Sequence, residues 1–233
     1  MQAPKTAGEQ QVGEQRIDGR AARSKRTREA VVRALLGLIS EGDLRPTAGR
    51  IAERAGISLR SVYVHFDDLD DLFVEASREQ RSRVLALTRV LPSAGPFETR
   101  LEAFVEQRAR VLEAIAAVAR ATALQEPFSP ALAAATKSAR KIGRAELERV
   151  FETELANLDA PTRDHVVDAC DALTTSDTWH TLRIRRGRSP NEAAATISTA
   201  LCVLLHTDAR QRARRWRVRP PATPGGTGGE ERR

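Results

Sequence analysis

The spacing of apolar residues predicts helices over most of the chain. Apolar residues recur three or four positions apart, and no segment shows the strict alternation that is typical of a half-buried strand. Helical patterns cover residues 24–40, 47–55, 58–66, 68–90, 97–126, 130–155, 161–184 and 190–205. The pattern therefore predicts an all-α protein.

Residues 47–66 have the pattern of two short helices joined by a tight turn. Thr47 and Ser58 can each cap a helix, because a hydroxyl accepts a hydrogen bond from an unpaired backbone N–H. Gly56 stands between them and can take the left-handed conformation that ends a helix. The small Ala52 and the β-branched Val62 would let the two helices cross closely. This arrangement predicts a helix-turn-helix. The expected inner faces are Ile51, Ala52 and Ala55 on the first helix and Leu59, Val62 and Phe66 on the second.

The polar residues around this unit point to DNA. Arg60 can reach guanine edges or phosphates, and hydroxyl and imidazole groups can reach phosphate oxygens. The residues expected to contact DNA are Arg45, Thr47, Ser58, Leu59, Arg60, Ser61, Tyr63 and His65. The alternative interpretation is a solvated helix face on an ordinary helical hairpin.

Residues 50–73 resemble the DNA-binding segment of the TetR family of one-component transcriptional regulators. The shared pattern is a helix-turn-helix that ends in Tyr63-x-His65-Phe66, followed by a short acidic turn into the next helix near Leu72. By motif, the resemblance covers about residues 24–76. The family often has a lysine that contacts a phosphate at the start of that next helix. This chain has Leu69 there, flanked by Asp67, Asp68, Asp70 and Asp71.

The resemblance implies a domain organisation. A three-helix DNA-binding domain would cover residues 24–67. A larger helical bundle for ligand binding and dimerisation would cover residues 68–217. In this family the last long helices of two subunits pack together as a four-helix bundle. The expected dimer residues are Ile197, Leu201, Leu204 and Leu205, although burial within one chain would give the same pattern.

The net charge of +7 is concentrated in the two ends of the chain. Residues 1–28 hold seven basic and three acidic residues (7 − 3 = +4), and residues 205–233 hold eight and three (8 − 3 = +5). Residues 1–23 are polar and without periodicity, so we expect a disordered basic arm that follows DNA phosphates or is only a solvated tail. Residues 218–233 are rich in Pro and Gly and should form a disordered tail.

Motifs of catalysis, cofactor binding and metal binding are absent from the sequence. There is no phosphate-binding loop, dinucleotide turn, HExxH or cysteine pair, so we expect no enzyme activity, no cofactor and no metal. Asp164, His165 and Asp168 form the nearest cluster, which is more typical of a solvated helix face. Cys170 and Cys202 are expected to be buried free thiols. The chain has no long apolar run and no apolar signal-peptide core, so a cytoplasmic protein without a membrane partner is expected.

Trp179 and the polar residues around it suggest a cavity in the C-terminal bundle. The residues expected to line an effector pocket are Phe104, Thr175, Trp179 and His180. An ordinary buried tryptophan with polar neighbours would give the same pattern.

Three functional hypotheses follow from these observations. The first is a homodimeric, ligand-responsive repressor that binds an inverted-repeat DNA operator and a small-molecule effector. The second is an architectural DNA-binding protein without an effector. The third is a helical enzyme, which no motif supports. The sequence does not identify the effector, the operator, the regulated genes or the sign of regulation.

Overall fold

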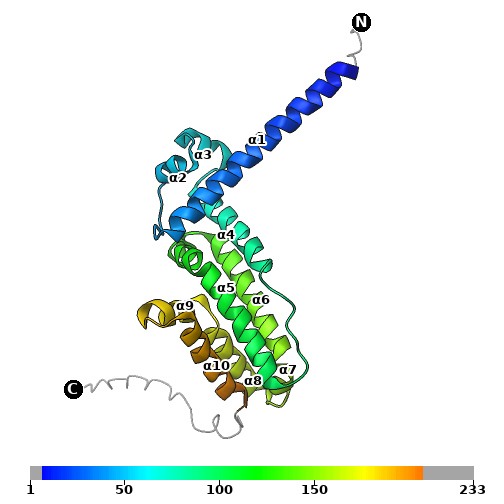
Figure 1. Cartoon of the computed structure of the whole chain (residues 1–233), viewed down its shortest axis with the longest axis vertical. Helices are drawn as coiled ribbons and strands as arrows, with labels where there is room; N and C mark the ends of the chain where they lie inside the picture. Colours follow the sequence, from blue (N-terminus) through cyan, green and yellow to red (C-terminus); the bar gives the residue numbers. More distant parts are fainter. Residues whose placement is uncertain (1–6, 207–233) are drawn as a thin grey trace, which may run out of the picture.

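The computed structural model describes the backbone of residues 7–206 and the side chains of residues 19–206, and it is an elongated stack of helices (Figure 1). No strand occurs within residues 7–206, which confirms the all-α prediction. The N-terminal helices are α1 (Ala7–Ser40), α2 (Ala48–Ala55), α3 (Leu59–His65) and α4 (Leu69–Leu85). The C-terminal elements are α5 (Phe97–Gln125), η1 (Glu126–Phe128), α6 (Pro130–Val150), α7 (Glu152–Ala156), α8 (Ala160–Leu173), α9 (Ser176–His180), η2 (Thr181–Arg185) and α10 (Pro190–His206).

Helix α1 is longer than the sequence pattern predicts. It begins at Ala7 rather than Ser24, so the prediction of a disordered arm is wrong for residues 7–23. These residues are polar but contain no proline, and a helix that is already nucleated gains one hydrogen bond for each added residue. The packed part of α1 can therefore continue as a solvated helix. Its N-terminal half projects away from the other helices (Figure 1). Residues 1–6 and the predicted tail at 218–233 lie outside the described residues.

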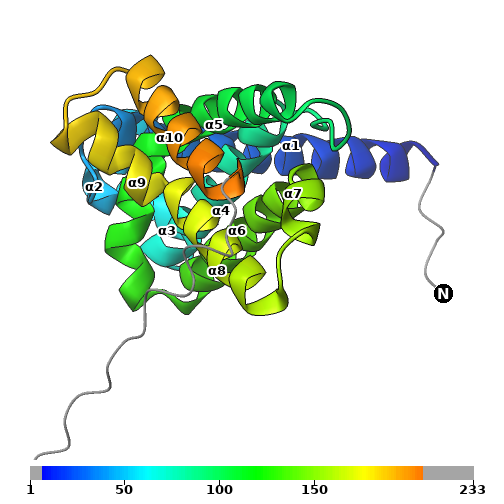
Figure 2. The same ribbon diagram turned by 90° about the horizontal axis from the view of Figure 1, so that it is seen from below.

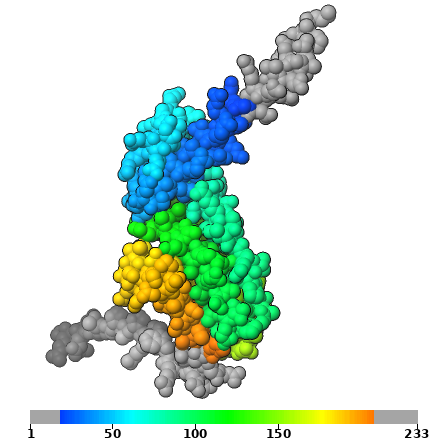
Figure 3. All heavy atoms as spheres, in the orientation of Figure 1, coloured from blue at the N-terminus to red at the C-terminus, as the bar shows by residue number. Residues whose placement is uncertain are grey.

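The first core joins α1, α2, α3 and α4. Its largest fully buried side chains include Leu35 and Ile39 of α1, Ile51 of α2 and Leu72 of α4, with Phe66 directly after α3. The same cluster contains Ala121 of α5 and Leu132 of α6. The N-terminal unit is thus packed directly onto the upper ends of the long C-terminal helices. Figure 3 shows these parts as one continuous body.

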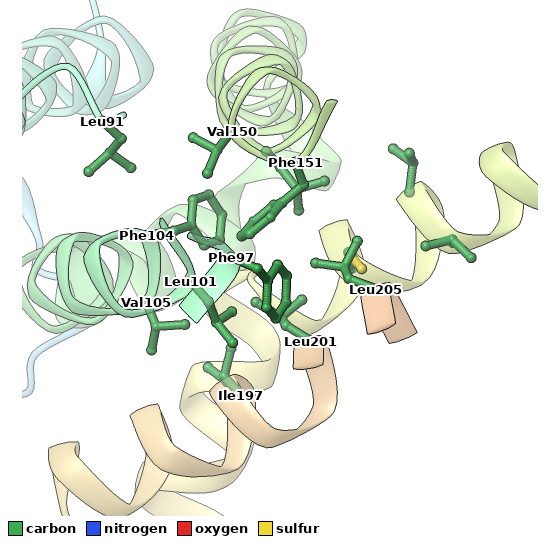
Figure 4. Close-up of a cluster of buried hydrophobic side chains, with 14 of the residues drawn as sticks. Leu91, Phe97, Leu101, Phe104, Val105, Val150, Phe151, Ile197, Leu201 and Leu205 are labelled. Carbon is green, nitrogen blue, oxygen red and sulfur yellow. The ribbon is translucent and has the colours of Figure 1, made fainter. Parts of the chain in front are cut away.

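The second core lies between α5, the α6–α7 junction, α8 and α10. Phe104 of α5 meets Phe151 edge-on, with 5.2 Å between ring centroids. Figure 4 shows Ile197, Leu201 and Leu205 of α10 pointing toward the same aromatic cluster. A capping box stabilises the start of α10, because Glu192 N donates to Ser189 Oγ (3.2 Å) and Ser189 N to Glu192 Oε2 (2.8 Å).

The packing of α10 corrects the predicted dimer residues. Ile197, Leu201 and Leu205 are only 2%, 0% and 9% exposed, because they pack against α5 and α8 of their own chain. Figure 2 shows how α10 lies among the helices of the C-terminal bundle. They cannot reach a second subunit while this core is intact. Leu204 is the one member of the predicted set that turns toward the other side of the helix.

Among the helices within residues 7–206, none has both the length and the apolar character that spanning a membrane requires.

Candidate nucleic-acid interface

The turn between α2 and α3 has the local geometry that its sequence predicts. Thr47 caps α2 by accepting from Arg50 N at 3.4 Å. Gly56 ends α2 with φ 68°, a left-handed conformation that favours glycine, and Ile57 N then donates to Ala52 O at 3.0 Å. Ala52 and Val62 are 3% and 1% exposed. These contacts hold α3 across α2 as a helix-turn-helix.

One face of helix α3 is exposed from its first turn to its last. Ser58 caps it by accepting from Ser61 N at 3.2 Å, while Val62 and Phe66 face the core. Leu59 is 48% exposed, so its predicted place on the inner face is wrong, whereas its predicted place on the DNA side agrees with its exposure. The reason is geometric, since Leu59 is the first helical residue and lies beyond the edge of the α1–α2 core.

The predicted DNA residues lie near one another around α3 and the start of α2. Arg45, Thr47, Ser58, Leu59, Arg60 and Tyr63 are exposed, and Ser61 and His65 are half-buried. Val64, at 71% exposed, shares the outer face but was missed by the sequence analysis. Its spacing of four from Arg60 is the signal that could have found it. A valine side chain at this place offers apolar contact to a thymine methyl group.

Ion pairing leaves two of the four arginines within residues 45–66 without a carboxylate partner among the side chains of residues 19–206. Arg50 binds Asp43 (2.7 Å), and Arg54 binds Glu41, whose pKa is held below its usual value by the hydrogen bonds from Arg54. Arg60 is exposed and has no ion pair within residues 19–206. Arg45 is also exposed, and among the described residues its side chain bonds only to a backbone carbonyl. Arg45 and Arg60 are therefore the cations best placed for an anionic partner.

Arg28 of α1 fastens the end of α3. Its Nη1 donates to His65 O, and its guanidinium lies over the Phe66 ring, 4.1 Å from the centroid. Its Nη2 is 3.8 Å from Asp71 and 3.6 Å from Glu75 of α4. One side chain thus joins α1, α3 and α4. This role could not be predicted from the sequence, because Arg28 is one of several similar residues in the basic run.

The acidic residues at the start of α4 stabilise that helix and its contact with α1. Asp68 caps α4, because its Oδ1 accepts from Asp71 N at 2.8 Å. Asp71 also faces Arg28, as described above. The negative charges at the start of α4 suit the positive end of the helix dipole, as expected from the sequence.

A hollow of about 250 Å³ separates the start of α2 from α4 and the end of α5. Its lining residues are Arg45, Pro46, Thr47, Ala48, Tyr63, Leu69, Asp70, Phe73 and Gln125. Leu69, which stands where the resembled family often has lysine, therefore lies in the same hollow as Arg45 and Tyr63.

None of the four predicted effector residues lines the hollow beside α3 or a second hollow on the outer face of α10. Phe104 is fully buried against Phe151. Trp179 is 1% exposed, and its Nε1 donates to Glu113 Oε2 at 2.8 Å. Arg183 also donates to Glu113, at 3.0 and 2.8 Å, and these bonds together with that from Trp179 lower the Glu113 pKa. Thr175 caps α9 by accepting from Thr178 N. These side chains serve packing and capping in this conformation.

The outer face of α10 carries the second hollow, of about 680 Å³. It is shallow and lined by small and apolar residues: Ala195, Thr196, Thr199, Ala200, Val203 and Leu204. Val203 is 44% exposed. This face is opposite the buried stripe of Ile197 and Leu201.

The geometry defines a two-part helical protein, with an N-terminal helix-turn-helix unit mounted on a larger helical bundle. No protein-family model and no curated protein sequence matches the chain. Solved structures do match its fold. A transcriptional regulator from Rhodococcus sp. Rha1 is 22% identical with a TM-score of 0.63, covering 76% of this chain and 95% of that one.

Two further solved structures with a similar fold are of TetR-family proteins. A tetR-family transcriptional regulator from Streptomyces coelicolor is 19% identical with a TM-score of 0.62, covering 77% of this chain and 80% of that one. A TetR transcription regulator from Haloarcula marismortui is 17% identical with a TM-score of 0.58, covering 78% and 97%. The chain has the fold of TetR-family transcriptional regulators, which confirms the resemblance read from residues 50–73.

Proposed function

We propose that this protein is a TetR-like transcriptional regulator that binds double-stranded DNA through α3. The observation that carries the proposal is the outer face of α3, where Arg60, Tyr63 and Val64 stand exposed on a helix held by both of its neighbours. A helix with this exposure fits the major groove, and its N-terminal residues would meet base edges. The basic residues of α1 between Arg20 and Arg28 and the exposed Arg45 add positive charge near it.

Selection of DNA from a random pool with the purified protein tests this function. We expect an enriched inverted repeat, with half-sites about one helical turn apart, because a two-fold dimer presents two equivalent helices. Enrichment of no sequence, together with equal affinity for all duplexes, would contradict a sequence-specific regulator.

The proposed dimer uses the outer face of α10. Small side chains at Ala195, Thr199 and Ala200 let another helix approach closely, and Val203 and Leu204 supply apolar area. The buried stripe of α10 is already occupied by its own chain, so a second copy would pack against the opposite stripe. Sedimentation of the wild-type protein should give twice the chain mass.

Regulation by a small molecule is the proposed second activity, with repression as the expected sign. In this proposal an effector binds the C-terminal bundle and favours a state in which two recognition helices no longer match successive major grooves. The loss of DNA affinity would equal the effector's preference for that state. The same proposal includes that the protein is cytoplasmic and that it is not an enzyme.

An architectural DNA-binding protein without an effector is the second candidate. The packed interior favours it, since Phe104 is in ring contact with Phe151 and Trp179 is bonded to Glu113. A panel of small apolar and amphiphilic compounds distinguishes the two. A compound that raises the melting temperature and releases the selected DNA supports the regulator. Compounds that do neither across the panel favour the architectural protein.

A further inference from the structure

The hollow beside α3 contains a single cation among its described lining residues. Arg45 lies on one side, and Leu69 and Asp70 of α4 lie on the other. Tyr63 belongs to the exposed face of α3 and also lines this hollow, so the hollow borders the proposed DNA surface. A phosphate near Tyr63 would meet the negative charge of Asp70. Arg45 is the lining residue that can offset this charge.

The side chain of Arg45 is held by a hydrogen bond to α5, a helix of the C-terminal bundle. Its Nη2 donates to Leu124 O at 3.0 Å, across 79 positions of sequence. Leu124 lies in the last turn of α5, where backbone carbonyls lack intrahelical partners and the helix dipole attracts cations. A guanidinium has five N–H donors in a rigid fork, so a bond to one carbonyl leaves others for a second acceptor.

We propose that Arg45 binds Leu124 O and a DNA phosphate at the same time, so that DNA affinity depends on the position of the end of α5. The inference rests on the proposed DNA-binding function and adds a residue through which the C-terminal bundle controls it. Anchored by Leu124 O, the side chain of Arg45 has fewer conformations to lose when it binds a phosphate.

Helix α5 can transmit a movement of the C-terminal bundle to Leu124 O, because it runs from the second core to the hollow. It has 29 residues and so spans about 43 Å, from the second core at Phe97 to the hollow at Gln125. Glu113, in its middle, binds Trp179 and Arg183. A change in the bundle that moves α5 would move Leu124 O away from Arg45. DNA affinity would then fall although no residue on α3 had moved.

Two substitutions of Arg45 distinguish the effect of its positive charge from the effect of its guanidinium geometry. Lysine keeps the charge, but it lacks the planar, rigid fork of donors, so it holds the carbonyl and the phosphate together less well. For a duplex selected by the wild type, Arg45→Lys should weaken binding about tenfold per half-site while keeping the slope of log K against log salt. Arg45→Ala should also lower that slope by about 0.9 per subunit. The matched control is Arg50→Lys, because Arg50 pairs with Asp43 at 2.7 Å within the DNA-binding unit.

Amide hydrogen exchange of the full-length protein tests the link to α5. With the wild type saturated by selected DNA, exchange should slow in α3 and also at residues 122–129, because the shared guanidinium stabilises the last turn of α5. With Arg45→Lys saturated by the same DNA, the slowing should persist in α3 and disappear at 122–129. Arg50→Lys should behave as the wild type at 122–129.

The results that overturn the inference differ from those that overturn the function. Wild-type affinity in Arg45→Lys, or unchanged exchange at residues 122–129 while α3 slows, would refute the sharing of Arg45 and leave DNA binding in place. Tighter binding by Arg45→Ala would mean that Arg45 hinders DNA binding, and would also refute it. No selected DNA and no slowing in α3 would refute both.

Discussion

Replacing Arg60 with alanine removes the arginine best placed to read a base. Arg60 follows Leu59 at the start of α3, where such helices meet base edges. Its side chain is exposed and makes no ion pair within residues 19–206. Alanine also has a slightly higher helix propensity than arginine. The melting temperature and the dimer should therefore be unchanged, and any loss of affinity belongs to DNA.

The size of that loss follows from the two-fold symmetry. A bidentate contact from arginine to guanine contributes about 1–3 kcal/mol per half-site. The two half-sites are separate and add, which gives about 2–6 kcal/mol for the dimer. At about 1.4 kcal/mol for each tenfold change, the affinity for the operator should fall between about 30-fold and about 10⁴-fold. Affinity for unrelated DNA should change little.

Fluorescence anisotropy with the selected duplex, followed by a second selection with the variant, measures this effect. We expect relaxed preference at one position in each half-site and an unchanged salt slope. Arg163→Ala is the matched control, since it removes the same charge from an exposed position of α8. If Arg60→Ala selects the parent consensus and lowers the salt slope by about 0.9 per subunit, Arg60 contacts a phosphate and the reasoning is wrong.

Four further predictions concern other parts of the molecule. Tyr63→Phe should weaken selected and unrelated duplexes about equally in anisotropy assays, since only a phosphate contact is lost. Ala200→Arg should sediment as a folded monomer with weak DNA binding; a folded dimer would exclude the outer face of α10. Deleting residues 1–23 should lower the salt slope by about 2–3 per subunit with an unchanged consensus, and an equal slope would make the segment only a tail. Glu154→Gln should lower the urea-unfolding free energy by about 2–3 kcal/mol, because Arg100 (3% exposed) loses its charged partner.

The loss of stability in Glu154→Gln should also depend on pH. Burial raises the pKa of Glu154 and is the largest single influence on it. The hydrogen bonds from Arg100, a backbone hydrogen bond and the positive charges of Arg100 and His206 together outweigh burial and hold the pKa below the ordinary 4.5. A lowered pKa stabilises the folded protein above the unfolded value and stops doing so as the pH falls through the folded value. The stability difference between wild type and Glu154→Gln should thus be full near neutral pH and shrink below about 4.5. A constant difference down to pH 3 would refute this pairing.

The helix-turn-helix could be predicted from the sequence because its determinants are local. Thr47, Gly56 and Ser58 act through hydrogen bonds and backbone conformations that span three to five residues. The side chains that close the crossing, Ala52 and Val62, are ten positions apart on the two helices that this turn joins. The exposed face of α3 then follows from helical periodicity alone.

The role of α10 could not be predicted in the same way. Its sequence contains two usable stripes, one with Ile197 and Leu201 and one with Ala200 and Leu204. Periodicity shows that both stripes are apolar or small, but it does not show which one the protein's own α5 and α8 cover. The tertiary structure assigns the first stripe to the core and leaves the second at the surface.

The sequence by itself determined the helical class, the helix-turn-helix and most of the residues around α3, because neighbours along the chain decide caps, turns and periodicity. Only the tertiary structure decided which groups from distant elements meet. Arg45 and Leu124 are 79 positions apart, Trp179 and Glu113 are 66 apart, and Arg28 and His65 are 37 apart. Each pair forms because packed helices bring together a donor and an acceptor that no local pattern connects.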